Sequence, residues 1–376
     1  MSIKISDCFD AGAITVVRAD HFDAIDLALR QDSRADFRQW FYFRLQGARG
    51  QACRMRFLNA AQAAFPGGWE NYQAVASYDR EHWFRVPTAY DGQVLTVSHT
   101  PEHDSVYYAY FEPYSQERHL AMLGRIQTSS LVRLDDLGNT VEGRDLDLVT
   151  VGDPGAARKV WIIARQHPGE TMAEWLAEGL LGALLDPVNP LAQELLQHSV
   201  FYIVPNMNPD GAVRGNLRTN AAGANLNREW MTPSRESSPE VFHVRNKIHQ
   251  TGCDLFLDIH GDETLPYVFV AGCEMLDNFS ERQAREQQCF IDEFQRANSD
   301  FQTAVGYEAS KYSADLLTLA SKYIGHTFGC VSLTLEMPFK DNANAPHPTT
   351  GWNGVRSMRL GRDMLRPIWR VLQQMA

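Results

Sequence analysis

The stretch Gln166-His167-Pro168-Gly169-Glu170-Thr171 holds the first residues whose types and spacing could do chemistry. An imidazole and a carboxylate three positions apart lie on one side of a single turn. Two histidines and one glutamate form a ligand set of catalytic zinc sites, so His167 and Glu170 could be two of three ligands. Because His-x-x-Glu is frequent by chance, the pair needs support from the rest of the chain.

Strand and helix patterns alternate around this motif. Residues 160–164 form a short apolar strand that runs into it, and residues 172–185 carry apolar side chains at helical spacing. Further strands are expected at residues 201–204, 255–259, 268–270 and 331–335, and a closing helix at residues 352–374. This alternation predicts an α/β domain with helices on both faces of a mixed sheet. Ligands in such sheets gather where the strands end.

Two more candidate site residues lie directly after these strands. His260 follows the strand at 255–259 and is the natural third metal ligand, with Asp258 placed to orient its ring. A carboxylate directly after an apolar strand is unfavourable to bury unless it is paired or functional. Glu336 is therefore interpreted as a general base beside a metal-activated water. The alternatives are a loop histidine that only forms hydrogen bonds and a glutamate in an ordinary ion pair.

The polar stretch between the strands at 201–204 and 255–259 is rich in Asn, Arg and Gly. A guanidinium group binds a carboxylate through two hydrogen bonds, so this composition suits recognition of a carboxylate. A solvated loop is the alternative for any single arginine. The repeated polar motifs make recognition the favoured interpretation: Asn208-Pro209-Asp210-Gly211, Arg214-Gly215-Asn216-Leu217-Arg218 and Asn225-Leu226-Asn227-Arg228.

Residues 1–118 have a different pattern, in which apolar and polar side chains alternate over short segments such as 37–45, 53–58 and 106–111. Turn residues separate these segments. We expect an antiparallel β-sandwich domain over residues 1–118, followed by a catalytic domain over residues 119–376.

Taken together, the motifs resemble the M14 zinc metallocarboxypeptidase family. The His-Pro-Gly-Glu-Thr form and the β-rich N-terminal portion that ends in Tyr110-Phe111-Glu112-Pro113-Tyr114-Ser115 are similar to its cytosolic carboxypeptidase branch. The resemblance implies a carboxypeptidase-like α/β fold, one zinc ion per chain, and hydrolysis of C-terminal amino acids from peptides or proteins.

The resemblance also implies a role for each matching residue. His167, Glu170 and His260 would bind zinc and leave one position open for water. Glu336 would activate that water and pass its proton to the leaving amine. Arg218 would polarise the scissile carbonyl and stabilise the oxyanion.

Substrate binding is implied for three more positions. Asn227 and Arg228 would hold the C-terminal carboxylate of the substrate, which makes the enzyme an exopeptidase. The family has a mobile substrate-binding tyrosine some twenty-odd positions before the catalytic glutamate. Tyr312, 24 positions before Glu336, fits that spacing loosely, and Tyr323 fits it less well.

The preferred C-terminal residue is not fixed by these motifs. An acidic side chain would need a cation, for which Lys311 and Lys322 are available, although both are equally compatible with surface positions. Two other functions stay open at this point. One is an aspartoacylase-like N-acyl amino acid amidohydrolase on the same scaffold. The other, less favoured because the metal and base positions are all filled, is a non-catalytic peptide- or carbohydrate-binding protein.

The composition of the chain limits the binding partners and the cellular compartment that are expected. The 376 residues include 35 basic and 46 acidic side chains, a net charge of −11 that disfavours nonspecific nucleic-acid or anionic-membrane binding. No apolar run is long enough for a membrane span, and residues 1–7 lack the apolar core of a signal peptide. Six scattered cysteines without close pairs suggest reduced thiols in a cytoplasmic protein. The oligomeric state cannot be derived from these features.

Overall fold

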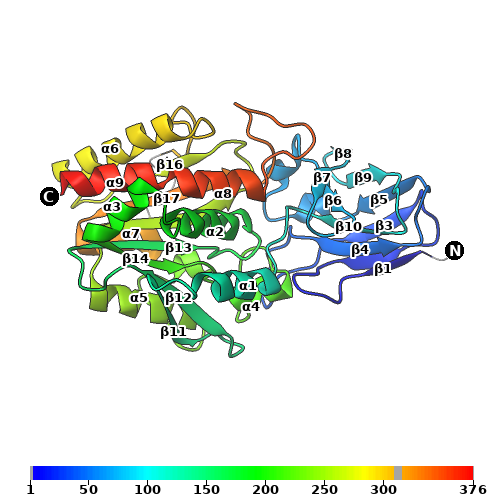
Figure 1. The fold of residues 1–376 in the computed structure, drawn as a ribbon. Helices are drawn as coiled ribbons and strands as arrows, with labels where there is room; N and C mark the ends of the chain where they lie inside the picture. The colour runs from blue at the N-terminus through cyan, green and yellow to red at the C-terminus, as the bar shows by residue number, and fades with distance from the viewer. Residues whose placement is uncertain (1–2, 309–315, 376) are drawn as a thin grey trace.

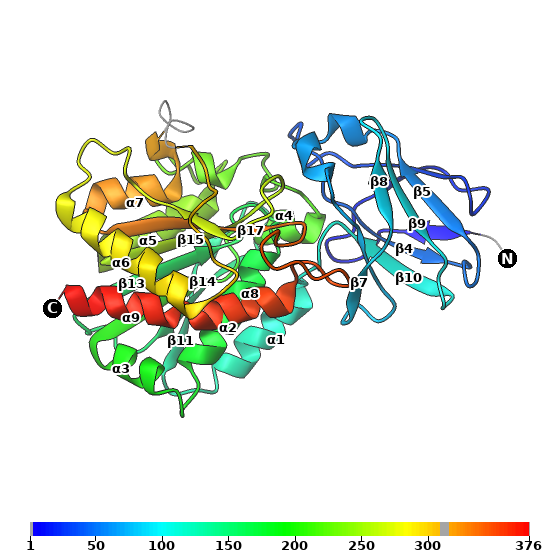
Figure 2. The same ribbon diagram turned by 90° about the horizontal axis from the view of Figure 1, so that it is seen from above.

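The computed structural model describes residues 3–308 and 316–375. Lys311 and Tyr312 lie outside the described residues, so their predicted roles are not addressed by the structure. A β-rich N-terminal part lies beside a larger α/β part, and the two chain ends lie at opposite ends of the molecule (Figures 1 and 2). None of the helices in the described residues is both long and apolar enough to cross a lipid bilayer.

The N-terminal part consists of two five-stranded sheets. The first contains, in spatial order, β1 (Lys4–Ser6), β4 (Tyr42–Gln46), β10 (Ser105–Ala109), β6 (Val75–Ser77) and β7 (Trp83–Arg85). The second contains β2 (Thr15–Arg18), β3 (Ile25–Ala28), β5 (Cys53–Phe57), β9 (Leu95–His99) and β8 (Thr88–Tyr90). Neighbouring strands are antiparallel, as predicted, except that β3 and β5 are parallel. The ring of Phe57 lies 4.6 Å from Phe41 and 6.3 Å from Phe43, which joins the two sheets into a sandwich.

The larger part is built on a seven-stranded mixed sheet. Its spatial order is β11 (Val132–Asn139), β12 (Asp145–Val151), β14 (Ser199–Val204), β13 (Arg158–Ala164), β15 (Leu255–Asp262), β17 (Val331–Pro338) and β16 (Phe269–Ala271). The four central strands, β14, β13, β15 and β17, are parallel, whereas β11, β12 and β16 pair antiparallel. The sheet is therefore mixed, as the sequence pattern predicts.

Helices cover both faces of this sheet. They are α1 (Gln116–Ile126), α2 (Met172–Leu184), α3 (Pro190–His198), α4 (Pro209–Arg214), α5 (Pro239–Thr251), α6 (Glu281–Ala297), α7 (Ala320–Phe328), α8 (Gly354–Asp363) and α9 (Leu365–Gln374). Side chains alternate between the faces: Val160 and Ile162 of β13 belong to the core with α2, α6, α8 and α9, while Trp161 and Ile163 pack with residues of α5 and α7. Because β13 is buried on both faces, its side chains are apolar without alternation, which explains the continuous apolar run over residues 160–164.

The closing helix differs from the prediction of one helix over residues 352–374. The structure has two helices, α8 and α9, which meet at Met364. Pro367 lies in the first turn of α9 and has no backbone N–H to continue the hydrogen bonds of α8, which accounts for the break.

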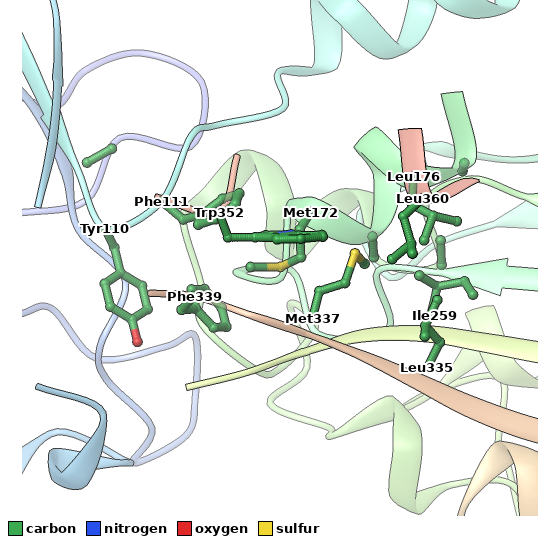
Figure 3. Packing of buried hydrophobic residues seen from close by; sticks show 14 of the residues in the cluster. Tyr110, Phe111, Met172, Leu176, Ile259, Leu335, Met337, Phe339, Trp352 and Leu360 are labelled. Carbon is green, nitrogen blue, oxygen red and sulfur yellow. The ribbon is translucent and has the colours of Figure 1, made fainter. Parts of the chain in front are cut away.

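An aromatic cluster joins the sandwich to the strand that carries Glu336. The ring of Phe339, just after β17, stacks on Tyr110 at 4.7 Å and contacts Phe111 edge-on at 5.9 Å. Figure 3 shows these rings in line with Trp352 and with the side chains between the sheet and α2. One continuous apolar core therefore spans both parts of the chain.

The close packing of α2 against α8 can be tested by alanine substitutions at two glycines of α2. A Cβ atom added to Gly179 would lie 2.1 Å from the carbonyl oxygen of Met358, whereas one added to Gly182 in the same helix meets nothing within 4 Å. Gly179→Ala should therefore lower the free energy of unfolding by about 1–3 kcal/mol. Gly182→Ala should leave it unchanged or raise it by roughly 0.5–1 kcal/mol through helix propensity. Equal denaturation midpoints for the two variants would contradict this packing.

Candidate active site

The carboxyl ends of β13, β15 and β17 meet at one edge of the sheet. These strands are neighbours and parallel, with Ala164 opposite Ile259 and His260 opposite Glu336. Residues that follow one another at strand ends in the sequence are thereby brought together, as the α/β pattern predicts.

Strand alternation separates the polar residues of this edge from the apolar core. Leu257 and Ile259 of β15 belong to the core beneath α2, while the intervening Asp258 and His260 point to the other face. Glu336 follows Leu335 in the same way on β17. His260 and Glu336 are therefore neighbours on one face of adjacent strands.

Three potential metal ligands converge at this position. The Nδ1 atom of His167 lies 2.6 Å from Glu170 Oε1, and the Nδ1 atom of His260 lies 2.8 Å from Glu170 Oε2. The two Nδ1 atoms are 3.2 Å apart. All three side chains are buried, and their ligand atoms lie within 4.8 Å of one another. In the described part of the chain this is the one such group of three or more histidine, cysteine or carboxylate side chains.

Each histidine is oriented through its other ring nitrogen. His260 Nε2 lies 2.9 Å from Asp258 Oδ1, and His167 Nε2 lies 3.0 Å from Asn225 Oδ1. The amide of Gln166 donates to both oxygens of Asp258 at 2.9 Å. These contacts leave both Nδ1 atoms turned toward Glu170, the arrangement in which outer hydrogen bonds fix metal-binding rings.

The electrostatics of the three side chains fit a divalent cation. Burial lowers the pKa of His167 to about 4, and the Arg218 guanidinium adds to this effect, so the ring is neutral at neutral pH as a metal ligand requires. Burial also opposes charge on His260, but Asp258 and Glu170 outweigh it and raise the pKa of that ring well above its ordinary value. The carboxylates therefore favour positive charge between the ligand atoms. Two imidazole nitrogens and a carboxylate form a donor set that suits zinc.

Glu336 is buried beside this group with one oxygen unsatisfied. Glu336 is only 6% exposed, and its Oε2 atom has no hydrogen-bond partner among the described residues. Burial raises the pKa of this carboxyl well above its ordinary value; His260 opposes the shift, whereas Glu170 and Asp262 add to it. The ion-pair alternative considered for Glu336 finds no support, since no ion pair of the described residues includes it.

The Asn208-Pro209-Asp210-Gly211 motif has a structural task. The Asn208 side chain accepts a hydrogen bond from Gly211 N at 3.1 Å and caps α4, while its amide donates to the Gln166 carbonyl at 3.0 Å. A Cβ atom on Gly211 would lie 2.6 Å from the Thr219 carbonyl oxygen. The motif therefore packs α4 against both the His167 loop and the segment that carries Arg218.

A cavity of about 520 Å³ opens over the three ligands. Every predicted site residue within the described ranges lines it: His167, Glu170, Arg218, Asn227, Arg228, His260 and Glu336. Asn227 accepts a hydrogen bond from Ala320 N at 2.8 Å, and its amide nitrogen lies 3.4 Å from His260 Nε2. Lys322 of α7 also lines the cavity.

Tyr312, the tyrosine predicted to bind substrate, lies outside the described residues, but two other tyrosines of this region are described. Tyr323 packs with the core beneath α5, and its hydroxyl contacts His249 at 3.0 Å, away from the cavity. Tyr307 lines the cavity instead and donates to Asp262 Oδ2 at 2.6 Å. No spacing or strand-end position distinguishes Tyr307 in the sequence. Asn225 lies within the polar stretch noted above, but nothing in the sequence predicts its contact with His167.

Comparison with known proteins agrees with this geometry. Residues 5–111 match the family model for the cytosolic carboxypeptidase N-terminal domain, and residues 120–373 match the model for zinc carboxypeptidases. The matched ranges together cover both parts of the fold.

Solved structures and curated relatives give the same result. A metallo-carboxypeptidase from Burkholderia cenocepacia is 60% identical, with a TM-score of 0.98 over 100% of both chains. A metallo-carboxypeptidase from Pseudomonas aeruginosa, solved in complex with (2-guanidinoethylmercapto)succinic acid, is 45% identical with a TM-score of 0.96 over 99% of this chain and 100% of that one. Human cytosolic carboxypeptidase 1 is 28% identical over 73% of this chain, which spans only 26% of that protein.

These matches cover most of the chain and agree with the His-Glu-His cluster found at the strand ends. The enzymes of this family are metallocarboxypeptidases, and the family implies a zinc cofactor and peptide substrates with free C-termini. The chain belongs to the M14 zinc carboxypeptidase family and carries the N-terminal domain of its cytosolic carboxypeptidase branch.

Proposed function

We propose that this metallocarboxypeptidase holds one zinc ion through His167, Glu170 and His260 and uses Glu336 as its general base. The observation that carries the proposal is the buried, unsatisfied Oε2 atom of Glu336 next to the ligand cluster. A buried carboxylate oxygen without a partner is unfavourable for folding, so its retention supports a function at that point.

When zinc is bound, it supplies Lewis-acid chemistry that lowers the pKa of a water molecule. Glu336 takes the proton of this attacking water and passes it to the nitrogen of the leaving amino acid. Burial raises the pKa of this carboxyl, which strengthens it as a proton acceptor. Arg218 lines the same cavity and donates to the carbonyl oxygen as negative charge develops there.

Asn227 and Arg228 hold the C-terminal carboxylate of the substrate. Both line the cavity, and an Arg228 Nη1 donates to the Asn227 carbonyl at 2.7 Å, which fixes the guanidinium beside the amide. A guanidinium and an amide together offer donors for both oxygens of a carboxylate. A peptide must therefore present a free C-terminus, and internal peptide bonds are excluded.

Glu336→Gln should keep zinc but lower kcat by several orders of magnitude, because it removes the proton acceptor and preserves the shape of the side chain. His167→Ala should instead lose the metal, measured as zinc per chain by elemental analysis. The substrate is a peptide with a free C-terminus, with the C-terminal amide of the same peptide as a control and an N-acyl amino acid as the test of the amidohydrolase alternative. Near wild-type turnover by the Glu336→Gln enzyme would rule out the assigned base.

We also propose that the enzyme prefers an acidic C-terminal residue. Lys322 is only 6% exposed, lines the cavity, and belongs to none of the ion pairs formed by the described residues. An unpaired cation is unfavourable to bury, so an acidic substrate side chain would supply a partner that the described residues do not. The neighbouring cavity residues Thr334 and Ala271 are small and leave room for such a side chain.

Lys322→Gln tests this preference with two matched peptides that end in glutamate or in glutamine. The substitution should lower kcat/KM for the glutamate peptide by about tenfold or more, because a charge pair inside the cavity is lost. It should leave the glutamine peptide within about threefold of wild type. An equal loss on both peptides would show that Lys322 supports the fold of the cavity and not its specificity.

The domain boundaries and the cellular location of the protein can also be proposed. We propose domains at residues 1–118 and 119–376, supported by the family-model matches to residues 5–111 and 120–373. We propose a cytoplasmic location, supported by six cysteines that are all free thiols. Cell fractionation with activity assays checks the location, and activity confined to a secreted fraction would contradict it.

A further inference from the structure

The segment that carries Arg218 lies between the two parts of the chain. On one side, Gly169 N of the metal-binding loop donates to the Leu217 carbonyl at 2.9 Å. On the other side, the loop between β3 and β4 of the sandwich reaches the same segment through Asp32. The position of Arg218 over the cavity therefore depends on contacts made by the N-terminal domain.

Asp32 holds this segment through four hydrogen bonds. Its Oδ1 atom accepts from Leu217 N at 2.6 Å, and its Oδ2 atom accepts from Arg218 N at 2.7 Å. Oδ2 also accepts from Thr219 N at 3.0 Å and from the Thr219 hydroxyl at 3.2 Å. Asp32 is only 6% exposed. A buried carboxylate that binds three consecutive backbone N–H groups fixes their orientation strongly, because these are charge-assisted hydrogen bonds.

Other residues of the sandwich complete the support. Ser33 donates from its backbone N and from its hydroxyl to Asn216 Oδ1, both at 3.2 Å. The guanidinium of Arg218 lies 5.3 Å from the ring centre of Phe65 and 5.8 Å from that of Phe37. Aromatic faces at these distances attract a guanidinium without using its N–H donors, which stay available for a substrate oxygen.

We propose that the N-terminal domain is part of the catalytic apparatus and that Asp32 is the positioning residue for Arg218. Asp32 acts on the backbone on either side of Arg218, while Phe37 and Phe65 contact its side chain. This inference rests on the proposed role of Arg218 at the substrate carbonyl. Misplacing an oxyanion donor by about 1 Å can lower turnover by as much as 100-fold, so a small shift of this segment would matter.

Asp32→Asn is the central variant, because it keeps the size of the side chain but brings an amide NH₂ against backbone N–H donors. It should lower kcat by about tenfold or more. KM should change by less than about threefold, because Asn227 and Arg228 still bind the substrate carboxylate. Zinc per chain should equal that of wild type, since no metal ligand is touched.

Asp26→Asn is the matched control. Asp26 is another buried carboxylate of the sandwich, and its partners are Arg18 at 2.8 Å and Arg56 at 2.7 Å instead of the Arg218 segment. The control should lower the thermal unfolding midpoint but leave kcat unchanged. A loss of kcat in both variants would show that any destabilisation of the sandwich impairs the enzyme, and the proposal would be overturned.

A double-mutant cycle with Arg218→Ala separates positioning from general stability. If Asp32 acts through Arg218, Asp32→Asn should cost less than about twofold in kcat once Arg218 is already absent. A full additional loss in that background overturns the proposal. Should Asp32→Asn fail to fold, Thr219→Val removes one of the four hydrogen bonds and should show a smaller loss of kcat with the same dependence on Arg218.

The cycle also distinguishes the two proposals from each other. If Arg218→Ala keeps wild-type kcat, the proposed role of Arg218 fails. If Arg218→Ala is impaired and Asp32→Asn is not, only the positioning role of Asp32 fails.

Discussion

The pairing of β15 with β17 is the constraint on which the rest of the site depends. It sets His260 opposite Glu336 and thereby places the third proposed metal ligand beside the proposed general base. A slip by one residue would turn every side chain of a strand to the other face. Leu257 and Ile259 prevent such a slip, because the slip would move them out of the core beneath α2. The apolar core of the sheet and the polar site at its edge are therefore fixed by the same register.

The buried carboxyl groups of this site lower the local stability of the fold. Glu336 is buried, and its Oε2 atom has no hydrogen-bond partner among the described residues. Glu170 lies between the two imidazole rings, where a bound cation would balance its negative charge. The apolar surroundings compensate: Phe339 joins the end of β17 to Tyr110 of the sandwich, so the same strand that carries Glu336 is anchored in both parts of the chain. Residues that oppose folding at one point are typical of functional sites.

Much of this arrangement can be predicted from the sequence, because its signals are local. His260 and Glu336 each follow an apolar run, and parallel strands bring such positions together at one edge of the sheet, so periodicity predicts that they meet. The β-sandwich follows from alternation over short segments in the same way. The family resemblance adds the roles of Arg218, Asn227 and Arg228, which no single spacing would assign.

The remaining features depend on contacts that leave no local pattern. Asp32 lies 185 positions before Leu217, and nothing around it in the sequence marks it as a partner of that segment. Tyr307 reaches the cavity from a segment without a strand or helix pattern, and Asn225 becomes important only through the position of the His167 ring. The contacts of such residues arise when separate helices, strands and loops pack against one another. The periodicity of the sequence does not predict this packing.

Digestion of a peptide library with free C-termini, before and after metal removal, is the decisive experiment for zinc-dependent carboxypeptidase activity. We expect release of single amino acids from the C-terminus, loss of that release with a chelator, and its return when one zinc ion per chain is restored. Release that persists in the metal-free enzyme, or cleavage that does not require a free C-terminus, would contradict this expectation.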